Sequence, residues 1–196
     1  MGRILGRPFD GDDHDDFSNE DRNNVRIFNS RLYAVQTLCI NYTSYDIRRD
    51  QDLINPSRQP FVMVRSPENG PKAHPYWYAQ VIGVFHTLAQ YMPMKGGSST
   101  INTEVQAMEV LWVRWLGIDP NHRSGFHAAR LPKVGFVPDT DKYAFGFLDP
   151  RMVIRACHLI PSFSDGYTSD LLRTQGVTAA RPLGAKSDWT NYYVGM

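Results

Sequence analysis

The chain has 196 residues, of which 42% are hydrophobic, 12% aromatic and 21% charged, a composition typical of globular proteins. This length suits one well-buried core, and a net charge of +1 lies far from that of strongly basic nucleic-acid-binding proteins. The longest apolar stretches are far shorter than the roughly 18 residues of a membrane span, so we expect no transmembrane helix and no membrane partner. Because the N-terminus lacks the long apolar core of a signal peptide, we expect a nuclear or cytoplasmic protein that is not secreted.

Residues 1–24 are rich in Gly, Asp and Asn and show almost no apolar periodicity. Seven acids lie between residues 10 and 21, whereas residues 22–196 carry 19 Lys and Arg against 13 acids, a net charge of +6. We therefore predict a disordered acidic tail at 1–24 and a single β-rich domain at 25–196. The acids around His14 resemble a metal loop only superficially, because they lack the glycine and terminal glutamate of a calcium-binding EF-hand.

From residue 25 onward, runs rich in Val, Ile, Leu, Tyr and Phe are separated by Pro, Gly and Asp. The runs lie at 31–45, 61–65, 76–91, 105–118, 133–137, 143–148 and 153–160. Strands at this spacing predict a mainly β fold, a β barrel or sandwich with long loops. We expect a hairpin loop at 93–100 and one short helix at about 149–155. The two cysteines, Cys39 and Cys157, are predicted to be small core residues in a reducing compartment.

Alternation along the two longest runs assigns their side chains to faces. In the run that ends at residue 118, Trp115 shares a face with Leu111 and Val113, whereas Trp112 shares the more polar face with Arg114. By the same rule, Trp77 lies on the apolar face of the run at 76–91 and Tyr78 on the other. We therefore predict that Trp77 and Trp115 are better candidates for the core than Trp112 and Tyr78.

No set of residues has the spacing of a catalytic site. His122 and His127 lie five apart, but no cysteine or carboxylate pair completes a zinc set. The chain has no Gly-x-Ser-x-Gly sequence, no cysteine within a catalytic motif and no P-loop spacing after Lys95. We therefore expect a protein that is not an enzyme and has no cofactor or metal. A metal-dependent nuclease-like enzyme remains an alternative, since carboxylates far apart in the chain can converge in a fold.

The two longest runs are also rich in aromatic residues and arginine. Ring faces attract cations, and adjacent aromatics in small β barrels can form cages for alkylated ammonium groups. The alternative for any single aromatic is packing in the core. The predicted binding residues are Tyr76, Tyr78, His86, Trp112 and Arg114.

Arginine outnumbers lysine by 16 to 5, and its guanidinium group suits bidentate contacts to phosphate. A nucleic-acid-contacting role is therefore the second candidate. Around residues 45–52 the charges alternate in sign, which favours local ion pairs over a phosphate-binding patch. The candidate phosphate-binding residues are Arg48, Arg49, Arg58 and Arg65, with Arg114.

Six segments carry a family resemblance. They are NYTSYDIRRDQDLINP at 41–56, HPYWYAQV at 74–81, LWVRW at 111–115, LPKVGFV at 131–137, FGFLDP at 145–150 and VIRACHLIP at 153–161. Together they resemble a domain found widely in uncharacterised proteins of mushroom-forming fungi, often at the C-terminal end of long proteins associated with Plavaka-type and related DNA transposons. The chain has no transposase catalytic region, so the resemblance implies a transposon-derived origin without transposition chemistry.

A looser similarity is to bromo-adjacent homology (BAH) domains of chromatin proteins. Residues 75–82, 111–115 and 153–158 follow the order of three strands characteristic of those domains. The similarity implies a bent, BAH-like or SH3-like β barrel used for protein recognition on chromatin. The expected function is thus a non-enzymatic, transposon-derived module that binds a protein or peptide, with chromatin as the expected setting.

Overall fold

The computed structural model describes residues 19–43, 49–68, 73–92, 104–174, 176–181 and 187–195. It is mainly β, with a nearly closed, barrel-like sheet, which confirms the predicted fold class. Among the described residues, the helices are α1 (Asn19–Asn23) and four single 3-10 turns, η1 (Phe28–Ser30), η2 (Phe126–Ala128), η3 (Pro150–Met152) and η4 (Phe163–Asp165). No described helix is long and apolar enough to cross a membrane.

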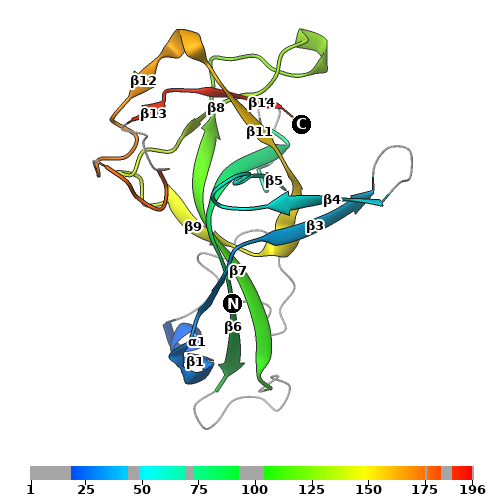
Figure 1. Ribbon diagram of the computed structural model, residues 1–196, viewed down its shortest axis with the longest axis vertical. Helices are drawn as coiled ribbons and strands as arrows, with labels where there is room; N and C mark the ends of the chain where they lie inside the picture. The colour runs from blue at the N-terminus through cyan, green and yellow to red at the C-terminus, as the bar shows by residue number, and fades with distance from the viewer. Residues whose placement is uncertain are drawn as a thin grey trace. The chain divides into compact units, whose positions relative to one another are not determined.

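Seven strands form the main path of the largest sheet, in the order β10-β5-β6-β7-β8-β14-β11 (Figure 1). They are β5 (Phe61–Arg65), β6 (Tyr76–Tyr91), β7 (Gln106–Ile118), β8 (Lys133–Phe136), β10 (Val153–Ala156), β11 (His158–Pro161) and β14 (Tyr192–Gly195). Three more strands pair with this path: β1 (Val25–Ile27) and β2 (Tyr33–Val35) with β6, and β9 (Phe145–Leu148) with β7. Two small sheets pair β3 (Leu38–Thr43) with β4 (Arg49–Ile54) and β12 (Tyr167–Thr168) with β13 (Asp188–Trp189).

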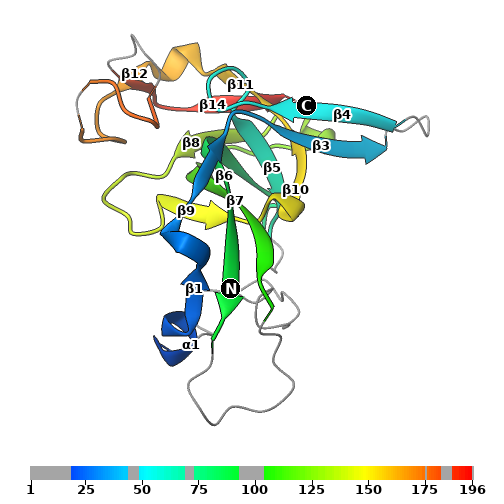
Figure 2. The same ribbon diagram turned by 60° about the horizontal axis from the view of Figure 1, so that its bottom comes forward.

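The contacts divide the chain into two compact units, one of residues 1–34 and 85–109 and the other of 35–84 and 110–196. The second, larger unit contains the barrel. Its two end strands, β10 and β11, are consecutive in the chain and are separated only by Cys157, whose backbone N–H donates to the carbonyl of Phe61. The chain therefore passes directly from one end of the strand order to the other, which brings the sheet close to closure (Figure 2).

The larger unit has two main hydrophobic clusters, and neighbouring residues of β5 and β6 alternate between them. Met63 and Tyr78 belong to one cluster, and Val62 and Ala79 to the other. The Tyr78 cluster also contains residues of β7, β8 and β14 and the residue between β10 and β11: Leu116, Val134, Phe136, Val194 and Cys157. Because β5 and β6 bury both faces, they read as near-continuous apolar runs.

This two-sided burial corrects the predicted faces. Tyr78 and Arg114, expected on the more polar faces, are buried with 1% and 0% of their surfaces exposed. Trp77 and Trp115, expected in the core, are only partly buried. Their rings pack edge to face with centroids 5.7 Å apart, and both lie against the cluster that contains Val62 and Ala79. Cys157 is buried as predicted, but the core prediction for Cys39 is wrong, because its side chain is exposed on β3.

One of the strands that the sequence pattern did not predict is rich in charged residues. Residues 49–54 overlap the stretch at 45–52 that was predicted to form local ion pairs. They form β4, which pairs with β3 from Thr43↔Arg49 to Leu38↔Ile54. Asp52 in β4 accepts a hydrogen bond from the backbone N–H of Ala156 at 2.9 Å and lies 3.5 Å from Arg155. The acid is thus partnered across the fold and not by its neighbours in sequence.

In the smaller unit, α1 and β1 lie within and just after the predicted tail. Asn24 is buried, and its carbonyl accepts a 2.8 Å hydrogen bond from the backbone N–H of Met92. Residues 19–24 are therefore structured, whereas residues 1–18 and the predicted loop at 93–100 lie outside the described part of the chain. The predicted short helix corresponds to η3, where the Asp149 carboxylate accepts from the backbone N–H of Arg151.

Candidate protein-binding surface

The five predicted binding residues do not form one surface. Tyr78 is buried in the cluster that contains Met63, and Tyr76 packs against that cluster. Burial raises the pKa of the Tyr78 hydroxyl. Trp112 is partly buried against Ile82, Leu172 and Ala180. His86 is exposed but belongs to the smaller unit, where its ring lies 5.1 Å from that of Tyr33.

Arg114, the fifth residue, belongs to a buried ionic network. Its Nη2 atom donates to a carboxylate oxygen of Asp188 at 3.1 Å and to the carbonyl of Leu171 at 3.0 Å. Arg181, also buried, donates to the same oxygen of Asp188 at 3.2 Å. The Arg114 guanidinium also lies 3.9 Å from the centre of the Phe136 ring. Arg114 therefore ties the C-terminal part of the chain to β7, and sequence reasoning gave no sign of its partners.

The candidate phosphate-binding arginines are exposed but spread out. Arg49 begins β4, Arg58 lies in the turn before β5, and Arg65 ends β5. Since each strand residue advances about 3.3 Å, Arg58 and Arg65 stand at opposite ends of a strand about 17 Å long. Arg48 lies outside the described residues. The three described arginines thus do not converge on one phosphate.

An exposed aromatic patch that the sequence pattern did not predict lies on the last third of the chain. It consists of Phe163, Tyr167 and Trp189. Tyr167 pairs with Trp189 between β12 and β13, and their rings are stacked with centroids 3.8 Å apart. Phe163 meets Trp189 edge to face at 5.2 Å. Phe163 and Tyr167 are 72% and 63% exposed, so the three rings form a contiguous apolar surface and leave no gap for a caged cation.

Polar contacts beneath the aromatic patch hold it in place. The hydroxyl of Thr190 donates to the carbonyls of Asp165 and Gly166, and Gly166 has a φ of 69°, which favours glycine. The Asp165 carboxylate accepts from the Asn191 side chain at 2.8 Å and pairs with Lys133 at 2.7 Å. These contacts hold the pKa of Asp165 well below its usual range, and the carboxylate raises that of Lys133.

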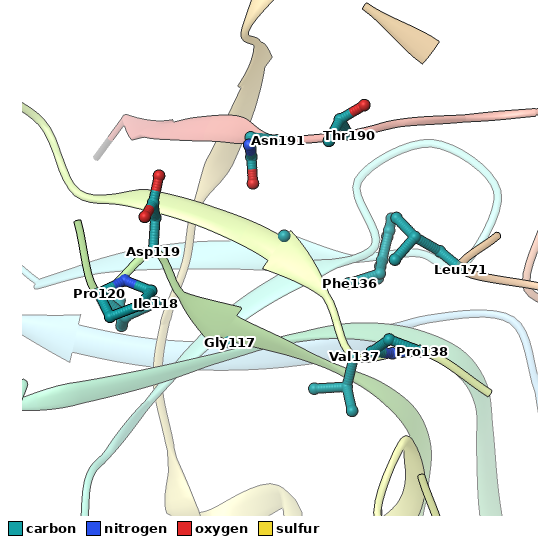
Figure 3. A pocket seen from close by; sticks show the side chains of 11 residues that line it. Gly117, Ile118, Asp119, Pro120, Phe136, Val137, Pro138, Leu171, Thr190 and Asn191 are labelled. Carbon is teal, nitrogen blue, oxygen red and sulfur yellow. The ribbon is translucent and has the colours of Figure 1, made fainter. Parts of the chain in front are cut away.

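Beside this segment, the surface is hollowed over a pair of glycines. Gly117 of β7 lies directly opposite Gly135 of β8, so neither strand places a side chain there. The hollow has a volume of about 420 Å³. Ile118, Asp119 and Pro120 lie at one end, and Val137, Pro138 and Leu171 lie at the other (Figure 3). Thr190 and Asn191, which follow the aromatic patch residue Trp189, complete its lining.

The two glycines differ in their surroundings. A Cβ atom on Gly135 would lie 2.9 Å from Oδ1 of Asn191 and 3.0 Å from the carbonyl of Thr190. A Cβ atom on Gly117 would have no other atom within 4 Å. Gly135 is therefore required for the approach of the Asn191 segment, whereas Gly117 leaves the hollow open.

The described residues contain no group of three His, Cys, Asp or Glu side chains that could hold a metal ion. Burial raises the pKa of the Cys157 thiol to about 12, so this cysteine stays protonated near neutral pH and is a poor nucleophile.

No family model, curated protein or solved structure matches the chain. Its function is therefore inferred from its own residues. One signal for the aromatic patch was present in the sequence: Phe163 and Tyr167 flank Ser-Asp-Gly, a turn sequence that exposes neighbouring side chains. The third ring, Trp189, follows 22 residues later in the chain and joins them only through the β12–β13 pairing.

Proposed function

We propose that the chain is a non-enzymatic module that recognises a protein or peptide through the aromatic patch of Phe163, Tyr167 and Trp189. The observation that carries the proposal is the exposure of Phe163 and Tyr167, whose rings pack on Trp189. Hydrogen bonds of Thr190 and Asn191 fix the segment that presents them. Large aromatic side chains are enriched at the centres of protein interfaces, where they contribute a large share of the affinity. A fixed apolar surface also loses little conformational entropy on binding.

The charges around the aromatic patch favour a protein over a nucleic acid. Single-stranded nucleic acids stack on aromatic rings, but their binding sites combine those rings with a positively charged groove. Near the patch, Lys133 is already paired with Asp165, and Asp170 follows β12 on the surface. A phosphate backbone would meet carboxylates here, so we favour a peptide that presents apolar side chains.

The expected setting of the partner follows from the resemblances described above. On the similarity to BAH domains and to transposon-associated fungal proteins, we propose a transposon-derived module with a chromatin protein as its partner. Enrichment of a tagged chain in the nucleus, and its release by nuclease digestion of chromatin, would support this part of the proposal. A chain found only in the cytoplasm would contradict it.

The test of the aromatic patch uses random 12-residue peptides displayed on phage and selected on the full chain. We expect the selected peptides to bind the double variant Phe163→Ala/Tyr167→Ala at least about tenfold more weakly, since both rings contribute apolar area at the centre of the contact. Unfolding temperatures should change little, because both side chains are largely exposed.

Two control variants make this test specific. Phe147, on β9 in the same unit, is 71% exposed, and Phe28, in the smaller unit, is 47% exposed. Peptides that bind Phe147→Ala and Phe28→Ala as tightly as the unmodified chain would support the aromatic patch. Peptides that no longer bind one of the control variants but still bind the double variant would show that a different surface binds them.

A further inference from the structure

We infer that the hollow over Gly117 and Gly135 receives a lysine or arginine side chain of the bound peptide. This inference rests on the proposed function and names the chemistry of the partner. The hollow and the aromatic patch share one segment: Trp189 belongs to the patch, and the next two residues, Thr190 and Asn191, line the hollow. One peptide can therefore reach both.

The lining of the hollow matches a long side chain that is apolar along its stem. Six of its lining residues are apolar and carry side chains: Ile118, Pro120, Phe136, Val137, Pro138 and Leu171. The only charged residue among the lining residues is Asp119, at one end (Figure 3). Lysine and arginine combine an aliphatic stem, which packs on apolar walls, with a charged head that stays near a carboxylate and water.

The charge at that end of the hollow is negative. Asp119, Asp165 and Lys133 form one cluster with two carboxylates and one ammonium group. Lys133 lies 2.7 Å from Asp165 but 3.6 Å from Asp119, so the ammonium group mainly neutralises Asp165. Asp119 also accepts a 2.9 Å hydrogen bond from the backbone N–H of Asn121 and keeps part of its carboxylate at the surface. A cation is the group that this carboxylate can still bind.

Substitutions at Gly117 and Asp119 test the inference directly. A side chain at position 117 would extend into the hollow without meeting another atom near its Cβ. The variant Gly117→Leu should therefore fold normally and occupy the space that the basic side chain needs. Asp119→Asn keeps the acceptor for the backbone N–H of Asn121 and removes only the charge. Asp141→Asn is its matched control, because Asp141 accepts in the same way from the backbone N–H of Tyr143 at 2.8 Å.

The experiment begins with the phage-selected 12-residue peptides and measures their dissociation constants by fluorescence anisotropy. We expect a lysine or arginine at a fixed distance from an apolar residue in the selected sequences. Replacing that lysine with norleucine, or that arginine with its uncharged isostere citrulline, should weaken binding about tenfold, the value of one charge-assisted hydrogen bond. Asp119→Asn should weaken the binding of the basic peptide by a similar factor and leave the binding of the neutral peptide unchanged. Asp141→Asn should change the binding of neither peptide. Gly117→Leu should abolish the preference for the basic residue.

The outcomes separate the two proposals. Selected peptides that depend on Phe163 and Tyr167 but bind equally well with norleucine would overturn the basic-residue inference and leave the aromatic patch standing. A preference for the basic peptide that persists in both Asp119→Asn and Gly117→Leu would show that the cation binds elsewhere. That result would overturn the inference as well. A basic preference that depends on Asp119 but not on the aromatic rings would overturn the proposed function alone. Failure to select any peptide would count against both.

Discussion

At the scale of single residues, the buried charges of the larger unit are unbalanced. One carboxylate, Asp188, faces two buried guanidinium groups, those of Arg114 and Arg181. Backbone carbonyls of Leu171, Leu172 and Thr174 share the positive charge. A buried charge is tolerated only when it is paired and hydrogen-bonded, so Asp188 has the largest electrostatic role in this network.

The variant Asp188→Asn should therefore be strongly destabilised. Removing one member of a buried ionic network leaves the others uncompensated and costs about 3–5 kcal/mol of unfolding free energy. Urea unfolding followed by tryptophan fluorescence measures the change. The control is Asp170→Asn on the same C-terminal part of the chain, where the side chain is exposed and little change is expected. Equal stability of the two variants would mean that Asp188 does not balance the arginines.

The two tryptophans of β7 should contribute similarly to stability. Alternation assigned Trp115 to the core and Trp112 to the opposite face, but both are partly buried and pack against separate clusters. Trp112→Ala and Trp115→Ala should each cost about 2–4 kcal/mol, somewhat less than a fully buried indole. Thermal melts of the two variants provide the comparison. A cost near zero for Trp112 alone would mean that its packing against Ile82, Leu172 and Ala180 contributes little to stability.

At the scale of elements, strand positions were predictable where apolar runs were bounded by Pro, Gly or Asp. The run at 61–65 coincides with β5, and the run at 76–91 coincides with β6. β4 was missed because its charged residues find partners elsewhere, as Asp52 does with the backbone of Ala156. The aromatic patch was missed because its third ring comes from another strand. Single-sequence patterns report local periodicity, and these features depend on contacts between distant segments.

The segment from η4 to β14 is held by the ion pair of Asp165 and Lys133, so its stability should depend on pH. The folded pKa of Asp165 is depressed below its ordinary value of 3.8, mainly by the hydrogen bond from Lys133. Its contribution is therefore complete well above pH 3.8 and is lost as the pH falls toward the depressed folded value. The pKa of Lys133 is raised above 10.5, so its contribution is lost only as the pH rises through the folded value.

Comparison of the chain with Asp165→Asn tests this assignment. The variant should have a lower unfolding temperature at pH 7. The difference should shrink as the pH falls below about 4, where the carboxyl group of the unfolded chain begins to bind a proton while that of the folded chain stays ionised. Thermal melts between pH 7 and pH 3 measure the difference. A difference that stays constant over this range would show that the amide replacement disturbs packing and that the ion pair contributes nothing.

At the scale of the whole molecule, composition and periodicity were sufficient for the fold class but not for the division of the chain. The smaller unit joins residues before β3 with residues from the middle of the chain, and this pairing joins segments about 60 residues apart, such as Val25↔Tyr91. The predicted boundary at residue 24 followed a change in composition. The contact between Asn24 and Met92 shows that structure begins earlier than the apolar periodicity does.

Two deletions should therefore behave differently. Removal of residues 1–18 should leave the unfolding temperature unchanged, because their acidic, glycine-rich composition supplies little apolar surface to bury. Removal of residues 1–24 also deletes α1 and the buried Asn24, and with it the carbonyl that accepts from the backbone N–H of Met92. The longer deletion should therefore melt at a lower temperature, because the Met92 N–H loses its partner and a typical intramolecular hydrogen bond contributes about 0.5–1.5 kcal/mol. Hydrogen exchange at the Met92 amide provides the specific readout: it should be protected in the shorter deletion and fast in the longer one. Equal protection in both would mean that the end of β6 is stable without the N-terminal segment.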